Sequence, residues 1–109
     1  MLIASRNLIL EEGGREVVIA VRLFQPAEKE LGWTCLYEIT WPQGTMRSEA
    51  YGYDSIQALL LALNKIAADL HASEHHRRGR LRWQKSGDGY GFPISHNLRD
   101  LLTGDDQRL

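Results

Sequence analysis

One segment near the middle of the chain, residues 53–72, carries a long and clean helical period. Asp54 is suited to cap its first turn, and Gln57, three residues later, can reach back to complete a capping box. Apolar residues recur at helical spacing in one stripe, which consists of Ile56, Leu59, Leu60, Leu63, Ile66, Ala67 and Leu70. We expect this stripe to face the core, with Leu60 and Leu63 fully buried.

Four segments ahead of this helix have the alternation or the β-branched and aromatic content of strands. They are residues 2–10, 16–24, 33–41 and 45–51. Gly13 and Gly14 separate the first two and predict a hairpin turn, because glycine accepts positive φ without a steric cost. The second strand is apolar on both faces and is therefore expected at the centre of the sheet. Residues 27–32 are expected to form a charged loop.

Four successive strands followed by one long helix favour an α+β fold, with an antiparallel meander of four or five strands and the helix packed on one face. Residues 1–109 are expected to form a single domain. A short fifth strand is expected at residues 81–83. Ser95 is expected to cap a short C-terminal helix at residues 96–102, and residues 103–109 are expected to form a frayed tail.

The two faces of the expected sheet differ in character. One face of the fourth strand is small and lets a helix approach closely, and its residues are Ser48, Ala50 and Gly52. The opposite face of the sheet carries apolar side chains that one helix cannot also cover, among them Val18, Phe24 and Leu36. We expect the C-terminal segment, a partner or a second copy to cover this second face.

Composition argues against several classes of protein. A net charge of −1 gives no global attraction to nucleic acid or anionic lipid. The one cysteine, Cys35, cannot form an internal disulfide, so nothing indicates an oxidising compartment. The first residues lack the basic region and long apolar core of a signal peptide, and no apolar run approaches the roughly 20 residues that span a bilayer. A cytoplasmic protein without a membrane partner is expected.

Three short motifs carry a resemblance to a known family. They are AYGYDSIQALLLAL at residues 50–63, LRW at residues 81–83 and GYGFP at residues 89–93. With the histidine- and arginine-rich stretch between them, they make the chain resemble a family of short bacterial proteins of unknown function. The resemblance implies a small stand-alone bacterial cytoplasmic protein. It supplies no activity, ligand or catalytic residue.

A basic segment follows the expected helix. Residues 71–85 contain five Lys or Arg and one acid, a local net charge of +4 in a chain of net charge −1. Its candidate binding residues are Arg77, Arg78, Arg80, Arg82 and Lys85, with the rings of Trp83 and Tyr90 nearby for stacking. Such a segment suits phosphate, nucleic acid or an acidic protein surface. The plainer interpretation is that the arginines cap helix carbonyls and pair with acids. Alternation predicts Arg80 and Arg82 on one side, with Trp83 pointing inward.

The histidines are weak metal candidates. His71 and His75 would lie one turn apart if the helix continued, a spacing suited to a transition metal. The helix is expected to end between them, however, where histidine side chains complement the helix dipole. The favoured interpretation is therefore that His71, His75 and His76 are solvated residues at a frayed helix end, and no metal or other cofactor is expected.

Two further features argue against an enzyme. The glycine-rich run at residues 87–93 lacks the Gly-Lys-Ser/Thr ending of a phosphate-binding loop, and is expected to be a turn that buries Tyr90 and Phe92. Cys35 lies in the middle of an alternating strand and is expected to be a small buried hydrophobe rather than a nucleophile. No serine-hydrolase elbow or diagnostic carboxylate pair is present. No catalytic residue is therefore expected.

These observations favour a small non-enzymatic module that binds another protein, as a regulator or an antitoxin-like partner, or that self-associates. The alternative is a module that binds an anion or a nucleic acid through residues 77–85. Nucleic acid is the less favoured ligand because the chain is acidic overall. The two alternatives differ in salt dependence, since phosphate contacts weaken steeply with salt and apolar interfaces do not.

Overall fold

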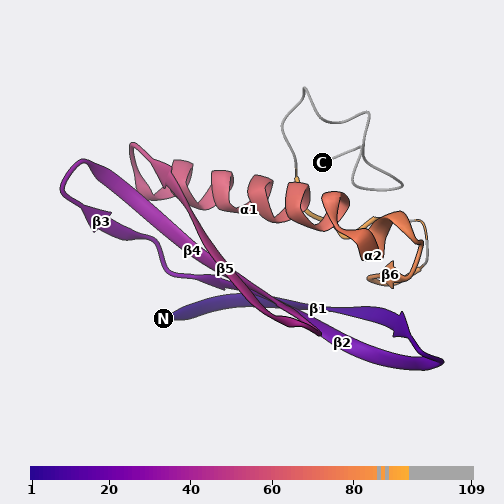
Figure 1. The fold of residues 1–109 in the computed structure, drawn as a ribbon. Helices are drawn as coiled ribbons and strands as arrows, with labels where there is room; N and C mark the ends of the chain where they lie inside the picture. Colours follow the sequence, from indigo (N-terminus) through magenta and orange to yellow (C-terminus); the bar gives the residue numbers. More distant parts are fainter. Residues whose placement is uncertain (86, 88, 94–109) are drawn as a thin grey trace.

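The computed structural model describes residues 1–85, 87 and 89–93 and has the expected α+β architecture (Figure 1). Its elements are β1 (Leu2–Glu12), β2 (Arg15–Phe24), β3 (Ala27–Lys29), β4 (Gly32–Trp41), β5 (Gly44–Gly52), α1 (Ser55–Ala72), α2 (Glu74–Arg77) and β6 (Leu81–Arg82). Both helices lie on the same face of one antiparallel sheet (Figure 1). None of the described helices combines the length and the apolar character that crossing a membrane requires.

The sheet is built from two long hairpins that share a short ladder. β1 pairs with β2, and β4 pairs with β5, over nearly their full lengths. The hairpins join where residues 21–23 of β2 pair with residues 37–39 of β4, so β2 is central, as expected. β6 pairs with the end of β1, which confirms the short fifth strand expected after the helix.

Two local expectations for the strand connections have different outcomes. The turn between β1 and β2 forms at Gly13 and Gly14, as predicted, with φ of 59° and 77°. The expected charged loop at residues 27–32 is wrong, because Ala27–Lys29 forms β3 and pairs with the start of β4. Backbone pairing requires no apolar side chain, and charged side chains suit an exposed strand at the margin of a sheet.

The ends of α1 follow from its sequence. Asp54 accepts a hydrogen bond from the Gln57 N–H at 2.8 Å, and the Gln57 side chain accepts one from the Tyr53 N–H at 2.6 Å. The predicted capping box therefore forms, except that the Gln57 side chain accepts from the N–H of Tyr53 instead of that of Asp54. α1 ends at Ala72, within the expected region, and Ser73 separates it from α2.

The expected core-facing stripe of α1 is wrong in its N-terminal half. Ile56 is 74% exposed and Leu60 is 50% exposed, while Leu63 is only partly buried. The helix instead buries a stripe that begins with small residues, namely Ala58, Ala62, Ile66, Ala67 and Leu70. This stripe meets the small face of β5, where the backbone of Ala58 approaches so closely that Gly52 has no room for a Cβ.

The sheet face that points away from α1 mixes charged and apolar side chains. Glu38 is buried there and pairs with Arg22 at 3.7 Å and with Arg47 at 2.6 Å. Val18 and Leu36 remain about half exposed, and the described helices lie on the opposite face (Figure 1). The expectation that the C-terminal segment, a partner or a second copy covers the face of Val18, Phe24 and Leu36 stays a prediction. The helix and tail expected at residues 96–102 and 103–109 lie outside the described residues.

Candidate functional site

The basic segment does not form one uniform charged patch. Arg77 and Arg78 both pair with Glu74, at 2.6 Å and 3.3 Å. Arg80 and Lys85 are exposed and form no ion pair within the part of the chain that the structure describes. Much of the local positive charge is therefore balanced by neighbouring carboxylates, as the plainer interpretation of the sequence expected.

Arg82 belongs to a different charge cluster. Leu81 is buried, so the next side chain in β6 points to the opposite side of the sheet. There Arg82 Nη1 lies 2.5 Å from Glu11 and Nη2 lies 2.7 Å from Glu16. Hydrogen bonds to Glu16 and then to Glu11 raise the pKa of the guanidinium above its ordinary value. The cluster ties β6 to both strands of the β1–β2 hairpin.

Trp83 and Tyr90, the two aromatic residues of the candidate site, both contact Arg6. The Arg6 guanidinium lies 3.8 Å from the centre of the Trp83 ring, and Nη1 donates to the carbonyl oxygens of Tyr90 and Gly91 at 3.0 Å each. A Cβ on Gly91, whose φ is 79°, would lie 2.4 Å from the Trp83 ring. Tyr90 and Phe92 are buried, so the glycine-rich run is a turn that buries two rings, as expected. Trp83 packs against the core, again as expected.

The histidines lie on both sides of the break between the helices, and they are partly buried against aromatic rings rather than solvated as expected. His75, in α2, stacks on Trp41 with ring centres 5.2 Å apart. His71, in α1, contacts the rings of His76 and Tyr90, at 4.7 Å and 5.1 Å. His76 Nδ1 lies 2.5 Å from the Tyr90 hydroxyl oxygen. Among the described residues, no three His, Cys, Asp or Glu side chains are placed together to hold a metal.

Two fully buried side chains of reactive types form hydrogen bonds inside the core. Cys35 Sγ donates to the Phe24 carbonyl at 3.3 Å, and burial raises the pKa of this thiol, which disfavours the reactive thiolate. The Tyr37 hydroxyl donates to Asp69 Oδ2 at 2.5 Å. Burial first, and this hydrogen bond second, raise the pKa of Tyr37. The Cys35 hydrogen bond joins β4 to β2, and the Tyr37 hydrogen bond joins β4 to α1.

Large apolar side chains lie exposed around the N-terminal half of α1. We call this set the α1 apolar surface, and it consists of Leu31, Tyr51, Tyr53, Ile56, Leu60 and Leu61. Four of them, Leu31, Tyr51, Tyr53 and Leu61, line a shallow hollow of about 340 Å³ on one flank of the helix. Ile56 and Leu60, one helical turn apart, lie on the other flank.

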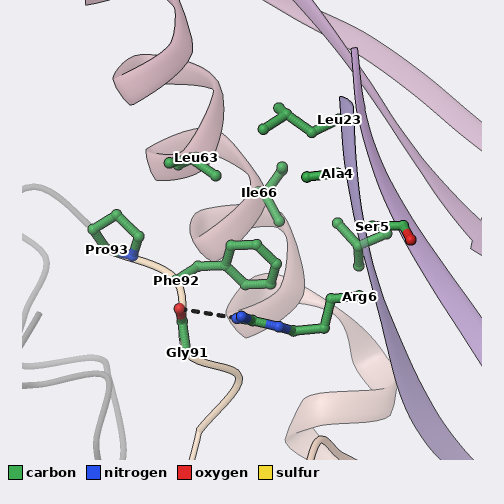
Figure 2. Close-up of a pocket in the computed structure, with 10 residues that line it drawn as sticks. Ala4, Ser5, Arg6, Leu23, Leu63, Ile66, Gly91, Phe92 and Pro93 are labelled. Carbon is green, nitrogen blue, oxygen red and sulfur yellow. Dashed lines mark hydrogen bonds between the residues drawn. The ribbon is translucent and has the colours of Figure 1, made fainter. Parts of the chain in front are cut away.

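A groove of about 230 Å³ continues this second flank. Leu63 follows Ile56 and Leu60 at helical spacing, and together with Ile66 it forms the helical wall of the groove (Figure 2). Ala4 and Leu23 of the sheet lie opposite, and Phe92 and Pro93 lie at the side (Figure 2). The hydrogen bond from Arg6 to Gly91 holds the glycine-rich turn against this groove (Figure 2). The apolar groove thus follows Ile56 and Leu60 along the same flank of α1.

Sequence reasoning missed the α1 apolar surface because it assigned Ile56 and Leu60 to the core. The signal that could have revealed the surface is a second stripe at helical spacing, which begins with Ala58 and Ala62 and meets the first stripe at Ile66. A helix with two apolar stripes and a single sheet to pack against must expose one of them.

A family model described as Domain of unknown function (DUF6968) matches residues 4–94. The match runs from β1 through the glycine-rich turn, so it includes both helices and the groove beside α1. It confirms the resemblance to a family of unknown function. Comparison with curated proteins and with solved structures finds no match.

Proposed function

The chain belongs to the family Domain of unknown function (DUF6968), and from its own geometry we propose that it is a non-enzymatic module that binds another protein. The observation that carries this proposal is the α1 apolar surface. Single exposed apolar residues are normal in proteins, whereas a group of them gathered in one region marks an interaction site. Here four exposed apolar residues line one hollow beside α1, and Ile56 and Leu60 of the helix are exposed as well.

The composition of this surface suits a protein partner. Tyrosines and large aliphatic side chains supply contact area in the centre of an interface, and charged residues are depleted there. Gln57 of α1, which lines the hollow together with Leu61, carries no charge. The hollow and the groove on either side of the helix offer recesses into which a partner's side chains can insert.

The positions of the reactive side chains support a non-enzymatic role. The Cys35 thiol and the Tyr37 hydroxyl are fully buried and hydrogen-bonded. His71, His75 and His76 pack against aromatic rings. We extend the proposal to a regulator or an antitoxin-like protein of the bacterial cytoplasm, where a lone buried thiol such as that of Cys35 stays reduced.

The alternative function is binding of an anion or a nucleic acid by residues 77–85. Arg80 and Lys85 support it, because both are exposed and neither forms an ion pair with the described residues. Arg77, Arg78 and Arg82 support it less, because each is already paired with a carboxylate. The apolar surface is therefore the better candidate.

The test is affinity capture from the source cell with the full chain as bait, followed by identification by mass spectrometry and a binding isotherm with the purified partner. The variant Ile56→Gln/Leu60→Gln removes the apolar character of one flank and keeps good helix formers. Arg80→Glu/Lys85→Glu is the matched control, since it also changes two exposed side chains.

We expect the glutamine variant to bind at least about tenfold more weakly, while the charge-reversed control binds like the wild type with little dependence on salt. If the charge-reversed variant loses binding and the glutamine variant keeps it, the anion-binding alternative replaces the proposal.

A further inference from the structure

The N-terminal strand has an edge with no described partner. β1 pairs with β2 along one edge, whereas β6 covers its other edge only at Ile9 and Leu10. From Leu2 to Leu8 that second edge meets no strand among the residues that the structure describes. Most side chains on this stretch are exposed, including Leu2 and Ile3.

Two observations show which backbone groups point outward from this edge. The Glu11 N–H donates to the Arg80 carbonyl next to β6, so Glu11 faces away from β2. Asn7 lies opposite Ala20, whose N–H turns away from β1 to donate to the Thr40 side chain of β4. In an antiparallel pair, two opposite residues both face each other or both face away, and the pattern alternates along the strand.

Asn7 therefore faces away from β2, and so does Ser5, two residues earlier. The Met1 carbonyl accepts a hydrogen bond from the Gln25 N–H on the β2 side, which agrees with a shift of the alternation at the bulge between Leu2 and Ala4. The N–H and C=O groups of Ser5 and Asn7 are thus directed at the open edge.

This edge lacks the protection given to the opposite margin of the sheet. At β5, Lys65 Nζ donates to the Glu49 carbonyl at 2.6 Å and to Ser48 Oγ at 3.2 Å, so a lysine blocks that edge. The one charged side chain between Leu2 and Leu8 is Arg6. It is turned onto the inner face, where it binds the carbonyls of Tyr90 and Gly91.

We propose that the β1 edges of two copies of this chain pair with each other as antiparallel strands about a two-fold axis at Ser5. The stretch from Ile3 to Asn7, between the bulge and β6, is centred on Ser5, so this register pairs that stretch throughout and stops short of β6. It also sets Arg6 opposite Ala4 of the other copy. A register centred on Arg6 would instead set two arginines against each other, which is unfavourable.

The pairing joins two sheets into one, with both α1 helices on the same face, because the two-fold axis is perpendicular to the sheet. The groove beside α1 is lined in part by Ala4, Ser5 and Arg6, so the two grooves lie next to the seam between the copies. The inference is independent of the proposed function, since it rests on the backbone of β1 and leaves the α1 apolar surface exposed.

The first test measures the mass of the full chain in solution by light scattering or sedimentation. We expect about twice the chain mass of 12.4 kDa. Ser5→Pro removes an N–H that points outward and leaves the β1–β2 ladder intact, so it should reduce the mass to that of one chain. Ser5→Val keeps the N–H and should remain a dimer. A monomeric wild type, or a dimeric Ser5→Pro variant, would overturn the proposal.

A second test reads the register and does not depend on how well the proline variant folds. Under oxidation, Ser5→Cys should give a disulfide-linked dimer, since opposite Cα atoms in an antiparallel pair lie about 5.5 Å apart, within disulfide range. Asn7→Cys is the matched control and should stay unlinked, because its two copies lie four residues apart along the strands. Linking of Asn7→Cys without linking of Ser5→Cys would contradict the Ser5 axis.

Discussion

The backbone of Gly52, at the end of β5, packs directly against the backbone of Ala58 in the first turns of α1. A Cβ added to Gly52 would lie 2.4 Å from the Ala58 nitrogen and 2.9 Å from its Cα. Both contacts are to backbone atoms, so no flexible side chain can move aside. This contact sets how closely α1 approaches the sheet, and it explains why the buried stripe of the helix begins with alanines.

Replacing Gly52 should therefore destabilise the fold in proportion to size. Gly52→Ala should lower the free energy of unfolding by about 1–3 kcal/mol through overpacking, and Gly52→Val should lower it further. Urea unfolding followed by circular dichroism measures both. Equal stability of the wild type and the valine variant would show that α1 does not touch β5 as described.

The two stripes of α1 can be compared with one type of substitution. Leu70→Ala removes a fully buried side chain and should cost about 2–5 kcal/mol, because it leaves a cavity. Leu60→Ala, in the same helix, removes a side chain that is 50% exposed and should cost less than about 1 kcal/mol. Chemical denaturation of the two variants in parallel gives the difference. Equal losses of unfolding free energy would show that Leu60 belongs to the core.

The difficulty of predicting this helix from sequence has a physical cause. The four long strands, the Gly13–Gly14 turn and both ends of α1 follow from local rules of alternation, φ and capping, so the sequence predicts them well. Which stripe of a helix is buried depends on the shape of the opposing surface. Leucines outweigh alanines in hydrophobicity, but it is the backbone of Ala58 that packs against Gly52, and that contact forms in three dimensions.

Tyr37 predicts a specific loss of stability at alkaline pH. Its pKa is raised in the folded state by burial and by Asp69, so the unfolded chain loses the phenolic proton first, from about pH 10. The unfolded state then binds fewer protons, and stability falls as pH rises above that value, by up to about 1.4 kcal/mol per pH unit.

The contribution of Tyr37 is measured as a difference between unfolding curves at pH 9 and above. Tyr37→Phe should be less stable than the wild type at neutral pH and should lack this part of the alkaline decline. Tyr53→Phe, at an exposed position, is the matched control and should decline like the wild type. An identical decline in all three proteins would contradict the assignment.

Two arginines of the basic segment should respond differently to charge reversal. Arg82→Glu places a third carboxylate beside Glu11 and Glu16 and should lower the Tm, with partial recovery at high salt because screening weakens the repulsion. Arg80→Glu changes an exposed side chain without an ion pair among the described residues and should leave the Tm within a few degrees. Differential scanning calorimetry at two salt concentrations distinguishes them. Equal shifts in Tm would contradict the separate cluster of Arg82.

The candidate site was harder to predict than the fold because its residues are distant in sequence. Glu11 and Glu16 reach Arg82 only through the pairing of β6 with β1, and no local spacing in the sequence predicts that contact. Similarly, Leu31 joins Tyr53 and Leu61 only because β3 and β4 bring their connection beside the start of α1. Local sequence identifies the residue types, and the topology decides which of them meet.

Side-chain footprinting with hydroxyl radicals, applied to the complex with the captured partner, tests the central claim most directly. Oxidation of each side chain is compared in the free protein and in the complex by mass spectrometry. The α1 apolar surface predicts strong protection of Tyr53, Ile56 and Leu60, with unchanged labelling across residues 77–85. Unchanged labelling of those three side chains, together with protection across residues 77–85, would contradict the account and place the binding site on the basic segment.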